Sequence, residues 1–302
     1  MNKIIIKVPA TSANLGPGFD ALGLALNIWN VTEIAEAGSF SLHIEGEGSK
    51  RLAHNNKNLI YRSVEKVYET VNREIPALYI HCLNQIPLAS GLGSSAAAIL
   101  TGILGANALL GSVLTKEEIL SLATEIEGHP DNIAPALCGG LVVSTMEDGK
   151  VIARQLPILP IHITVVLPEF DFTTKQARAV LPKQVPLKDA IHNISRAVLV
   201  TEAFRTGDLG LLGQAMSDTL HQPYRLPLIP GALAAMEAGK KAGASAVALS
   251  GAGPSLIAFS AEHDAEIGLA IKQGFESAGL SAQVFELGVS QEGAQVVNEE
   301  LP

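Results

Sequence analysis

The sequence has little that would support a disulfide framework, a zinc site or a membrane anchor. Its 302 residues include only two cysteines, Cys82 and Cys138, and these form no Cys-x-x-Cys pair. Two isolated cysteines favour neither bridges nor structural zinc, so we expect packed thiols. No apolar run reaches the roughly 18 residues that span a membrane, and the N-terminus has no secretory signal pattern. We therefore expect a cytoplasmic protein with no membrane partner.

Basic residues are also scarce. The chain carries 21 lysines and arginines against 30 aspartates and glutamates, a formal charge of −9. Because nucleic-acid binding depends on neutralising phosphates with basic side chains, this balance predicts no nucleic-acid partner. A single nucleotide is compatible with it, since backbone amides and a metal ion hold phosphates locally. The length and the hydrophobic content of 47% allow a full core, in one large domain or two ordinary ones.

A turn rich in glycine and serine at residues 87–98 is the most informative segment. It has no charged residue and runs directly into an alanine-rich helix. Gly91 and Gly93 let backbone N–H groups approach a ligand, and the helix that begins near Ser94 offers unpaired N–H groups and the positive end of its dipole. The segment predicts a phosphate-binding loop, the alternative being a turn without a ligand. The expected phosphate-binding residues are Pro87, Leu88, Ala89, Ser90, Gly91, Leu92, Gly93, Ser94, Ser95, Ala96 and Ala97.

Two commoner phosphate motifs do not fit this segment. The spacing from Gly91 through Gly93 to Ala96 matches a dinucleotide fingerprint, which needs a strand after its helix. Here the helix ends at Gly111 and a second helix opens with a capping box at Thr115. Nothing in the chain matches the lysine-containing loop Gly-x-x-x-x-Gly-Lys-Ser/Thr. We therefore expect neither of these two sites.

Two further glycine-rich segments lie beside apolar runs. Residues 9–20, Pro-Ala-Thr-Ser-Ala-Asn-Leu-Gly-Pro-Gly-Phe-Asp, present the polar side chains of Asn14 and Asp20. Residues 250–255, Ser-Gly-Ala-Gly-Pro-Ser, are typical of a hairpin turn between two strands. A turn explains either segment alone. Three such segments in one chain favour a composite site.

These three segments, in this order, resemble the motifs of the GHMP kinases, a superfamily of small-molecule kinases. The first segment and residues 127–140, Glu-Gly-His-Pro-Asp-Asn-Ile-Ala-Pro-Ala-Leu-Cys-Gly-Gly, are most similar to homoserine kinases. The resemblance extends from Val8 to about Phe259. It implies ATP-dependent phosphorylation of the side-chain hydroxyl of L-homoserine, a step of threonine biosynthesis, and a homodimer. The alternatives are a GHMP kinase for another small alcohol and a catalytically silent nucleotide-binding sensor.

The resemblance also implies a fold. It is an α+β fold with an N-terminal ATP-binding domain, which contains a left-handed βαβ crossover, and a C-terminal ferredoxin-like domain. We place the boundary in Pro157-Ile-Leu-Pro160, giving domains of residues 1–157 and 158–302, and we expect residues 291–302 to be disordered. The patterns predict strands at 4–8, 22–27, 31–35, 40–45, 78–83, 139–145, 161–167, 246–249, 256–259 and 282–285. They predict helices at 58–70, 94–110, 115–127, 174–181, 187–205, 208–220, 230–242 and 265–278.

Phosphoryl transfer needs Mg²⁺ on the phosphate oxygens, donors for developing charge and an acceptor oxygen in line. Magnesium prefers hard oxygen ligands and keeps several waters. The resemblance places its carboxylate at Glu127, with Ser94 as the hydroxyl, and Glu125 is close enough in sequence to be the alternative carboxylate. The third glycine motif contributes Gly251 and Gly253. Adenine is expected near residues 55–61 and the loop before Pro87.

The resemblance assigns the acceptor site as well. Arg178 and Arg225 lie where homoserine kinases hold the carboxylate of the amino acid, for which a bidentate guanidinium is suited. Asn14 and Asp131 are expected to accept from the ammonium group, and His129 to line the same pocket.

Asp20 is expected to face the acceptor hydroxyl. A carboxylate with a pKa of about 4 is a weak base for an alcohol whose pKa is about 16. In a loose transition state the proton leaves late, so Asp20 would orient the hydroxyl and accept the proton at the end. The motifs contain no lysine to assist it. Asp20, Glu127 and Ser94 are thus the predicted catalytic residues, and the existence of a true base is left open.

Overall fold

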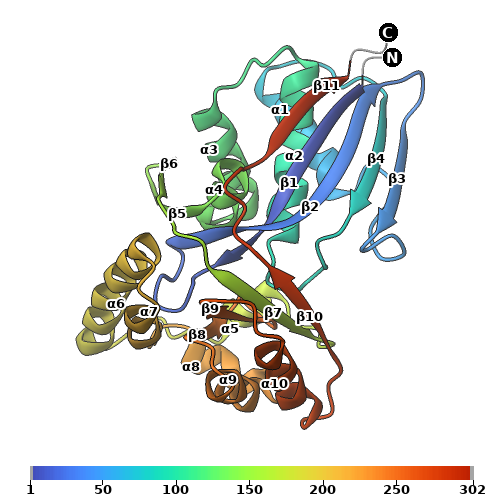
Figure 1. The fold of residues 1–302 in the computed structure, drawn as a ribbon. Coiled ribbons are helices and arrows are strands. Elements are labelled where there is room, and N and C mark those ends of the chain that lie inside the picture. Colours follow the sequence, from blue (N-terminus) through green and yellow to red (C-terminus); the bar gives the residue numbers. More distant parts are fainter. Residues whose placement is uncertain (1–2, 300–302) are drawn as a thin grey trace.

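Two sheets organise the chain, and helices pack on both of them (Figure 1). The computed structural model describes residues 3–299. In the first sheet the order is β11-β1-β2-β4-β3, while β5 pairs with β2 and β6 with β5. Its strands are β1 (Lys3–Ala13), β2 (Leu22–Glu36), β3 (Ser41–Gly46), β4 (Leu78–Asn84), β5 (Leu141–Glu147), β6 (Lys150–Leu156) and β11 (Gln295–Glu299).

Helices pack on this sheet, and we call the sheet and these helices the first lobe. The second sheet and its helices, described below, form the second lobe. The helices of the first lobe are α1 (Leu59–Thr70), α2 (Ser94–Leu109), α3 (Lys116–Glu127) and α4 (Pro130–Cys138). α2 is apolar on nearly every side and is buried over most of its length, as expected of a helix without a polar face. It packs against α1, α3, α4 and β1. α1 connects β3 to β4, whose pairing is parallel, so the chain makes a βαβ crossover at this point.

The second sheet has the order β10-β7-β9-β8, and each of these pairs is antiparallel. Its strands are β7 (His162–Pro168), β8 (Ala246–Leu249), β9 (Leu256–Ser260) and β10 (Ala282–Leu287). Helices connect β7 to β8 and β9 to β10, which gives the ferredoxin-like β-α-β-β-α-β succession that the sequence resemblance implied. These helices are α5 (Thr174–Ala179), α6 (Leu187–Thr206), α7 (Leu209–Ala215), α8 (Gln222–Arg225), the short 3₁₀ helix η1 (Leu226–Leu228), α9 (Ala232–Lys241) and α10 (Ala265–Glu276).

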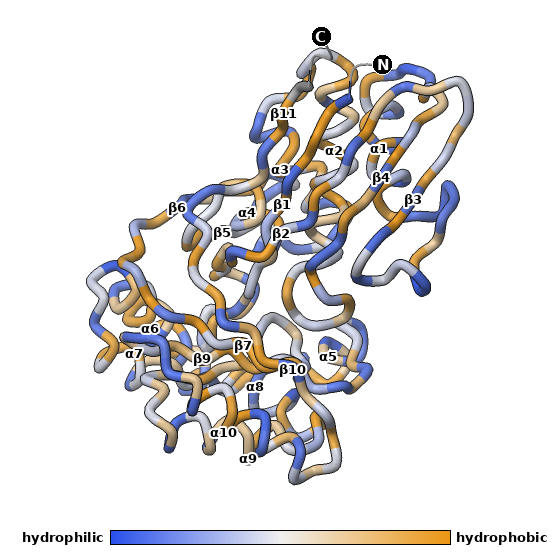
Figure 2. Tube along the Cα trace, turned by 45° about the vertical axis from the view of Figure 1, so that its right-hand side comes forward, coloured by the Kyte–Doolittle hydropathy of each residue, from blue (hydrophilic) through white to orange (hydrophobic). Residues whose placement is uncertain are grey.

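One hydrophobic core extends across both lobes. It joins fully buried strand residues of the first sheet, such as Ile6 and Leu24, to Ile163, Phe204 and Phe259 of the second lobe. A second cluster lies between the outer face of the second sheet and helices α9 and α10. Figure 2 shows hydrophobic residues concentrated along strands of both sheets, for example in β1 and β7. The shared core fixes the two lobes against each other. Among residues 3–299, no helix is long and apolar enough to cross a membrane.

Several predicted boundaries were wrong. β1 continues from the predicted strand 4–8 to Ala13, because residues 10–13 pair with β2 beyond a bulge at Pro9. The strands predicted at 22–27 and 31–35 are one strand, β2. Helix α4 was not predicted because it contains two prolines, which are unfavourable inside a helix. Strand β6 was not predicted because most of its residues are exposed. The helix predicted at 208–220 ends at Ala215. Beyond it, the Asp218 carboxylate accepts from the backbone N–H groups of residues 220–222, the last of which begins α8.

The expectation of a disordered tail was wrong for residues 295–299. These residues form β11, which pairs with β1 so that Val297 lies opposite Ile5. The strand contains only two apolar residues among polar ones, so its sequence lacks the hydrophobic pattern typical of a strand. Its position is determined by pairing with the edge of β1. Residues 300–302 lie outside the described residues. β11 therefore belongs to the first sheet.

The contact between β2 and α4 leaves no room for a side chain at Gly23. A Cβ there would lie 1.9 Å from the carbonyl oxygen of Asp131 and 2.7 Å from the Pro135 ring. We expect Gly23→Ala to push α4 away from the sheet and to lower the free energy of unfolding by about 1–3 kcal/mol, the usual cost of overpacking. Denaturant titration measures the loss. Gly38→Ala, where a Cβ meets nothing within 4 Å, is the matched control.

Candidate functional site

The three glycine-rich segments meet and bind one another. Ser250 donates its hydroxyl hydrogen to the Gly91 carbonyl oxygen at 2.7 Å. The Gly251 N–H donates to the Ala13 carbonyl oxygen at 3.1 Å, and the Gly251 carbonyl oxygen accepts from the Asn14 amide at 2.8 Å. Segments that are more than 200 residues apart in the sequence are thus joined by direct hydrogen bonds. The site is composite, as the sequence indicated.

Two glycines of the middle segment allow this close approach. Gly91 has φ +77°, and a Cβ there would lie 2.2 Å from the carbonyl oxygen of Ser250. Gly93 has φ +70°, and a Cβ there would lie 2.0 Å from the Thr11 hydroxyl oxygen. Gly93 is also the residue that precedes the first turn of α2, so no side chain caps this helix. The N–H groups at the start of α2 remain available to an anion.

A cavity of about 290 Å³ opens where these segments meet. It is lined by the predicted site residues Asn14, Asp20, Ser94, Glu127, His129, Asp131, Arg178, Arg225, Gly251 and Gly253. Of the predicted phosphate loop, the lining residues are Ala89, Ser90, Gly91, Gly93, Ser94 and Ser95. Pro87, Leu88, Leu92, Ala96 and Ala97 do not line it. Leu92, Ala96 and Ala97 are instead fully buried in the core.

The structure places Glu127, and not Glu125, in this cavity. Glu127 ends α3 and accepts a hydrogen bond from the Ser95 hydroxyl at 2.6 Å. Burial raises the pKa of Glu127, and the Ser95 hydrogen bond partly opposes this effect. Glu125 points to another face of α3, where its exposed carboxylate forms an ion pair with Lys66 at 3.0 Å.

Oxygen donors suitable for Mg²⁺ meet at this point. Among residues 3–299, no cluster of three or more His, Cys, Asp or Glu forms a complete cage for a metal ion. Magnesium does not need one, because it commonly takes one or two carboxylates together with waters and phosphate oxygens. The Glu127 carboxylate and the hydroxyls of Ser94 and Ser95 line one cavity beside the start of α2. This donor set fits a magnesium ion that also binds phosphates.

His129 and Asp131 form a second polar pair in the cavity. The His129 Nδ1 lies 2.6 Å from the Asp131 carboxylate, which is buried in the first turn of α4. Burial disfavours the charged form of His129, but the hydrogen bond and the charge of Asp131 outweigh this effect. The pKa of His129 therefore lies above its ordinary value. Pro130 begins α4 at a position that needs no N–H donor, so it sets these two side chains side by side.

Asp20 has a partner that the motifs did not reveal. Arg178, at the end of α5, donates to both carboxylate oxygens of Asp20 at 3.1 and 2.8 Å. The backbone N–H of Asp20 donates to the Asn14 amide oxygen at 3.0 Å, which holds Asp20 at φ +55°. The sequence showed no basic residue near Asp20. Its partner comes from the other lobe, 158 residues away.

Arg225 is almost fully buried, at 1% exposure. Its Nε donates to the Ala177 carbonyl oxygen at 3.1 Å, and one Nη lies 3.2 Å from His221. Burial, together with the nearby charge of Arg178, lowers the pKa of Arg225 to about 10. It remains a cation at neutral pH without a carboxylate in direct contact. A buried guanidinium of this kind favours an anionic ligand group.

The family models match two parts of the chain. The model of the GHMP kinases N terminal domain matches residues 58–140, and that of the GHMP kinases C terminal matches residues 200–276. The homoserine kinase of Moorella thermoacetica is 46% identical over 294 residues, which cover 97% of this chain and 99% of that protein. The chain belongs to the homoserine kinase family of GHMP kinases. The homoserine kinase of Carboxydothermus hydrogenoformans is 42% identical and covers 96% of each chain.

Solved structures agree with this family. The crystal structure of the homoserine kinase from Cytophaga hutchinsonii superposes with a TM-score of 0.87 at 32% identity, over 98% of both chains. The crystal structure of L. major mevalonate kinase in complex with R-mevalonate superposes with a TM-score of 0.70 at 17% identity. It covers 94% of each chain and shows the GHMP fold alone.

The sequence analysis missed one aromatic residue, Phe19, which contacts both arginines of the site. The guanidinium carbons of Arg178 and Arg225 lie 5.7 and 5.2 Å from the centre of the Phe19 ring. Such distances are typical of cation–π contacts. Phe19 lies inside the first glycine motif, and a lone aromatic residue in a glycine turn was the available signal. The residues that line the cavity and were not predicted as site residues are Asn132, Phe172, Thr173, Thr174 and Ala252.

A second, more apolar cavity of about 400 Å³ adjoins the first. The two share Ala89, Ser94 and Ser95. Its other walls come from β2, β4 and the start of α1. They include residues 57–60, which lie within the region 55–61 where the family resemblance led us to expect adenine.

The charge pair of His129 and Asp131 predicts a pH-dependent stability. Since the folded-state pKa of His129 is raised, the pair contributes fully below about pH 6.5, the ordinary pKa of histidine. Its contribution is lost as the pH rises through the folded-state value. We expect the stability advantage of the wild type over His129→Gln to decrease from pH 6 to pH 9 in metal-free denaturant titrations. A difference that grows with pH would contradict the pairing.

Proposed function

We propose that this protein transfers the terminal phosphoryl group of ATP to the side-chain hydroxyl of L-homoserine, forming O-phospho-L-homoserine for threonine biosynthesis. One observation carries the proposal. A single cavity contains a helix N-terminus for phosphates, the buried cation Arg225 for a carboxylate, and the carboxylates of Asp20 and Asp131 for a hydroxyl and an ammonium group. The relatives named homoserine kinase, 46% and 42% identical, support this acceptor.

ATP fits across the two adjoining cavities. The backbone of residues 89–95 and the start of α2 would hold its phosphates, and the apolar cavity beyond Ala89 would take adenine. Glu127 and Ser94 would hold Mg²⁺, with Ser95 orienting the Glu127 carboxylate. When bound, the ion supplies positive charge to the phosphate oxygens. Burial raises the pKa of Glu127, which means that its charged form is disfavoured in the absence of a cation. A bound Mg²⁺ would stabilise that charged form.

The acceptor would lie between the two lobes. Arg225 would bind its carboxylate, and Arg178 would share that group while it holds Asp20. Asn14 and Asp131 would accept from the ammonium group, with His129 orienting Asp131 through their 2.6 Å hydrogen bond. Each charged group of an amino acid would then have a partner. A sugar or a simple alcohol would leave the buried guanidinium of Arg225 without an anionic partner.

Asp20 would orient the acceptor hydroxyl. Its carboxylate is held by two hydrogen bonds from Arg178, which fix its orientation in the cavity. In a loose transition state little proton transfer is needed until the new P–O bond has formed, so Asp20 would receive the proton late. Arg178 would then be close enough to stabilise negative charge on the transferred group.

The acceptor is tested by measuring ADP release with Mg-ATP and a panel of L-homoserine, L-serine, L-threonine, mevalonate, shikimate and galactose. We expect L-homoserine to be strongly preferred, because it alone places its hydroxyl near Asp20 while its carboxylate reaches Arg225. Preference for another alcohol would overturn the acceptor and keep the kinase. Release that no alcohol stimulates would favour the nucleotide-binding sensor.

The metal-binding role is tested with two neighbouring glutamates. We expect Glu127→Ala to lower kcat by roughly 10² to 10³, the loss typical of one missing transition-state contact. Glu125→Ala is the matched control, since this exposed carboxylate pairs with Lys66 outside the cavity and surface pairs contribute little. Equal effects of the two substitutions on kcat would remove Glu127 from the site.

Four other expectations remain predictions. They are the cytoplasmic location, the lack of nucleic-acid binding, the homodimer, and the division into an N-terminal ATP-binding domain of residues 1–157 and a C-terminal domain of residues 158–302.

A further inference from the structure

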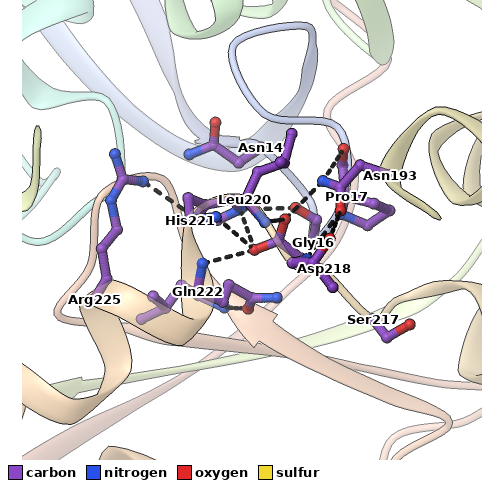
Figure 3. Close-up of polar contacts among 12 residues, drawn as sticks. Asn14, Gly16, Pro17, Asn193, Ser217, Asp218, Leu220, His221, Gln222 and Arg225 are labelled. Carbon is purple, nitrogen blue, oxygen red and sulfur yellow. Dashed lines mark hydrogen bonds and ion pairs between the residues drawn. The ribbon is translucent and has the colours of Figure 1, made fainter. Parts of the chain in front are cut away.

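A buried polar network joins Arg225 to the first glycine motif, and the proposed chemistry gives no role to its members Asp218 and His221 (Figure 3). Its centre is the segment 216–221 between α7 and α8, where the side chains of Asp218 and His221 are both fully buried. Burial of ionisable groups is costly unless each polar atom has a partner. The partners of these two side chains show what the network holds in place.

Asp218 fixes the start of α8. Its carboxylate accepts from the backbone N–H groups of Leu220, His221 and Gln222 at 2.9, 3.0 and 2.6 Å. It also accepts from the Asn193 amide of α6 at 2.7 Å. A carboxylate at this position satisfies N–H groups that have no partner within the helix. The turn that ends at Arg225 is thereby held at a fixed place.

His221 connects this turn to the first glycine motif. Its Nε2 lies 2.7 Å from the Gly16 carbonyl oxygen, so Nε2 carries the hydrogen and donates it. Its Nδ1 lies 3.2 Å from an Nη of Arg225, which has only hydrogens to donate, so Nδ1 accepts. One neutral ring thus links Gly16 to Arg225. Phe19 of the same motif stacks on this ring, with centroids 5.2 Å apart.

Further contacts hold the glycine motif on the same segment. The Asn193 amide donates to the Pro17 carbonyl oxygen at 3.1 Å. A Cβ at Gly16 would lie 2.5 Å from the carbonyl oxygen of Met216, so the two backbones are in contact. This motif also carries Asp20. The network therefore sits between the two groups that would bind opposite ends of the acceptor.

We propose that His221 is a positioning residue that sets the separation between Asp20 and Arg225, and that it thereby selects acceptors by the number of carbons between hydroxyl and carboxylate. The proposal rests on the proposed function, in which Asp20 faces the hydroxyl and Arg225 binds the carboxylate. Apolar contacts alone discriminate one methylene group by about 10- to 200-fold. A rigid link between the two polar contacts adds to this discrimination.

Two substitutions separate the two hydrogen bonds of His221. Asn places a polar atom near Nδ1, so His221→Asn keeps a contact to Arg225 and loses the donor to Gly16. Gln places one near Nε2, so His221→Gln keeps the donor to Gly16 and loses the acceptor for Arg225. His43→Gln, on the exposed face of β3, is the matched control. Melting temperatures and ATP affinities of all four proteins report whether the fold and the phosphate loop are intact.

The measured quantity is the ratio of kcat/KM for L-homoserine to kcat/KM for L-serine, which is one methylene group shorter. We expect His221→Asn to lower this ratio by about tenfold, the lower limit for one methylene group, because the loop with Asp20 is released. We expect His221→Gln to raise KM for L-homoserine more than it lowers kcat, because Arg225 loses the acceptor that His221 Nδ1 provides. ATP affinity and the His43→Gln control remain at wild-type values.

Two results would overturn the proposal. One is a ratio in both folded variants equal to that of the wild type, whatever the change in melting temperature, because His221 would then only stabilise the fold. The other comes from the wild type and needs no variant: ¹⁵N-histidine NMR at pH 7.5 is expected to show hydrogen on Nε2 only, and hydrogen on Nδ1 would exclude the link to Arg225. If the wild type prefers another alcohol, the proposed function fails. The same ratio is then measured for that alcohol and its shorter homologue.

Discussion

The site depends on the close contact of three backbone segments, which only glycine permits. The Gly91 backbone lies against the Ser250 carbonyl group, and the Gly251 N–H binds β1 at Ala13. The first segment ends β1, the second precedes α2 and the third connects β8 to β9. The phosphate loop is therefore supported by both lobes. A helix N-terminus binds an anion strongly only when its N–H groups are held in place, and these contacts supply the support.

The two lobes contribute charged side chains of opposite sign to the cavity. The first lobe contributes Asp20, Glu127 and Asp131, whereas the second contributes Arg178 and Arg225. The two hydrogen bonds between Asp20 and Arg178 join the lobes at the cavity itself. The net charge of −9 therefore does not describe the site. Local placement of cations allows an acidic protein to bind acidic ligands.

Much of the site was predictable from sequence, because the phosphate loop lies in a glycine-rich motif and the family resemblance indicated Glu127, Arg178 and Arg225. The predicted acceptor and metal residues line one cavity in the structure, whereas several predicted phosphate-loop residues do not. Contacts between distant segments were not predictable in this way. The partner of Asp20 comes from α5, and His221 reaches Gly16 across 205 residues. No local pattern encodes either pair.

The pairing of β11 with β1 has a consequence for folding. It joins residues 3–7 to residues 295–299, which are far apart in the sequence. A nascent chain that has completed every other strand still presents an open edge along Ile4 to Lys7. Such an edge can pair with other chains. The first sheet is therefore complete only after residues 295–299 have been synthesised.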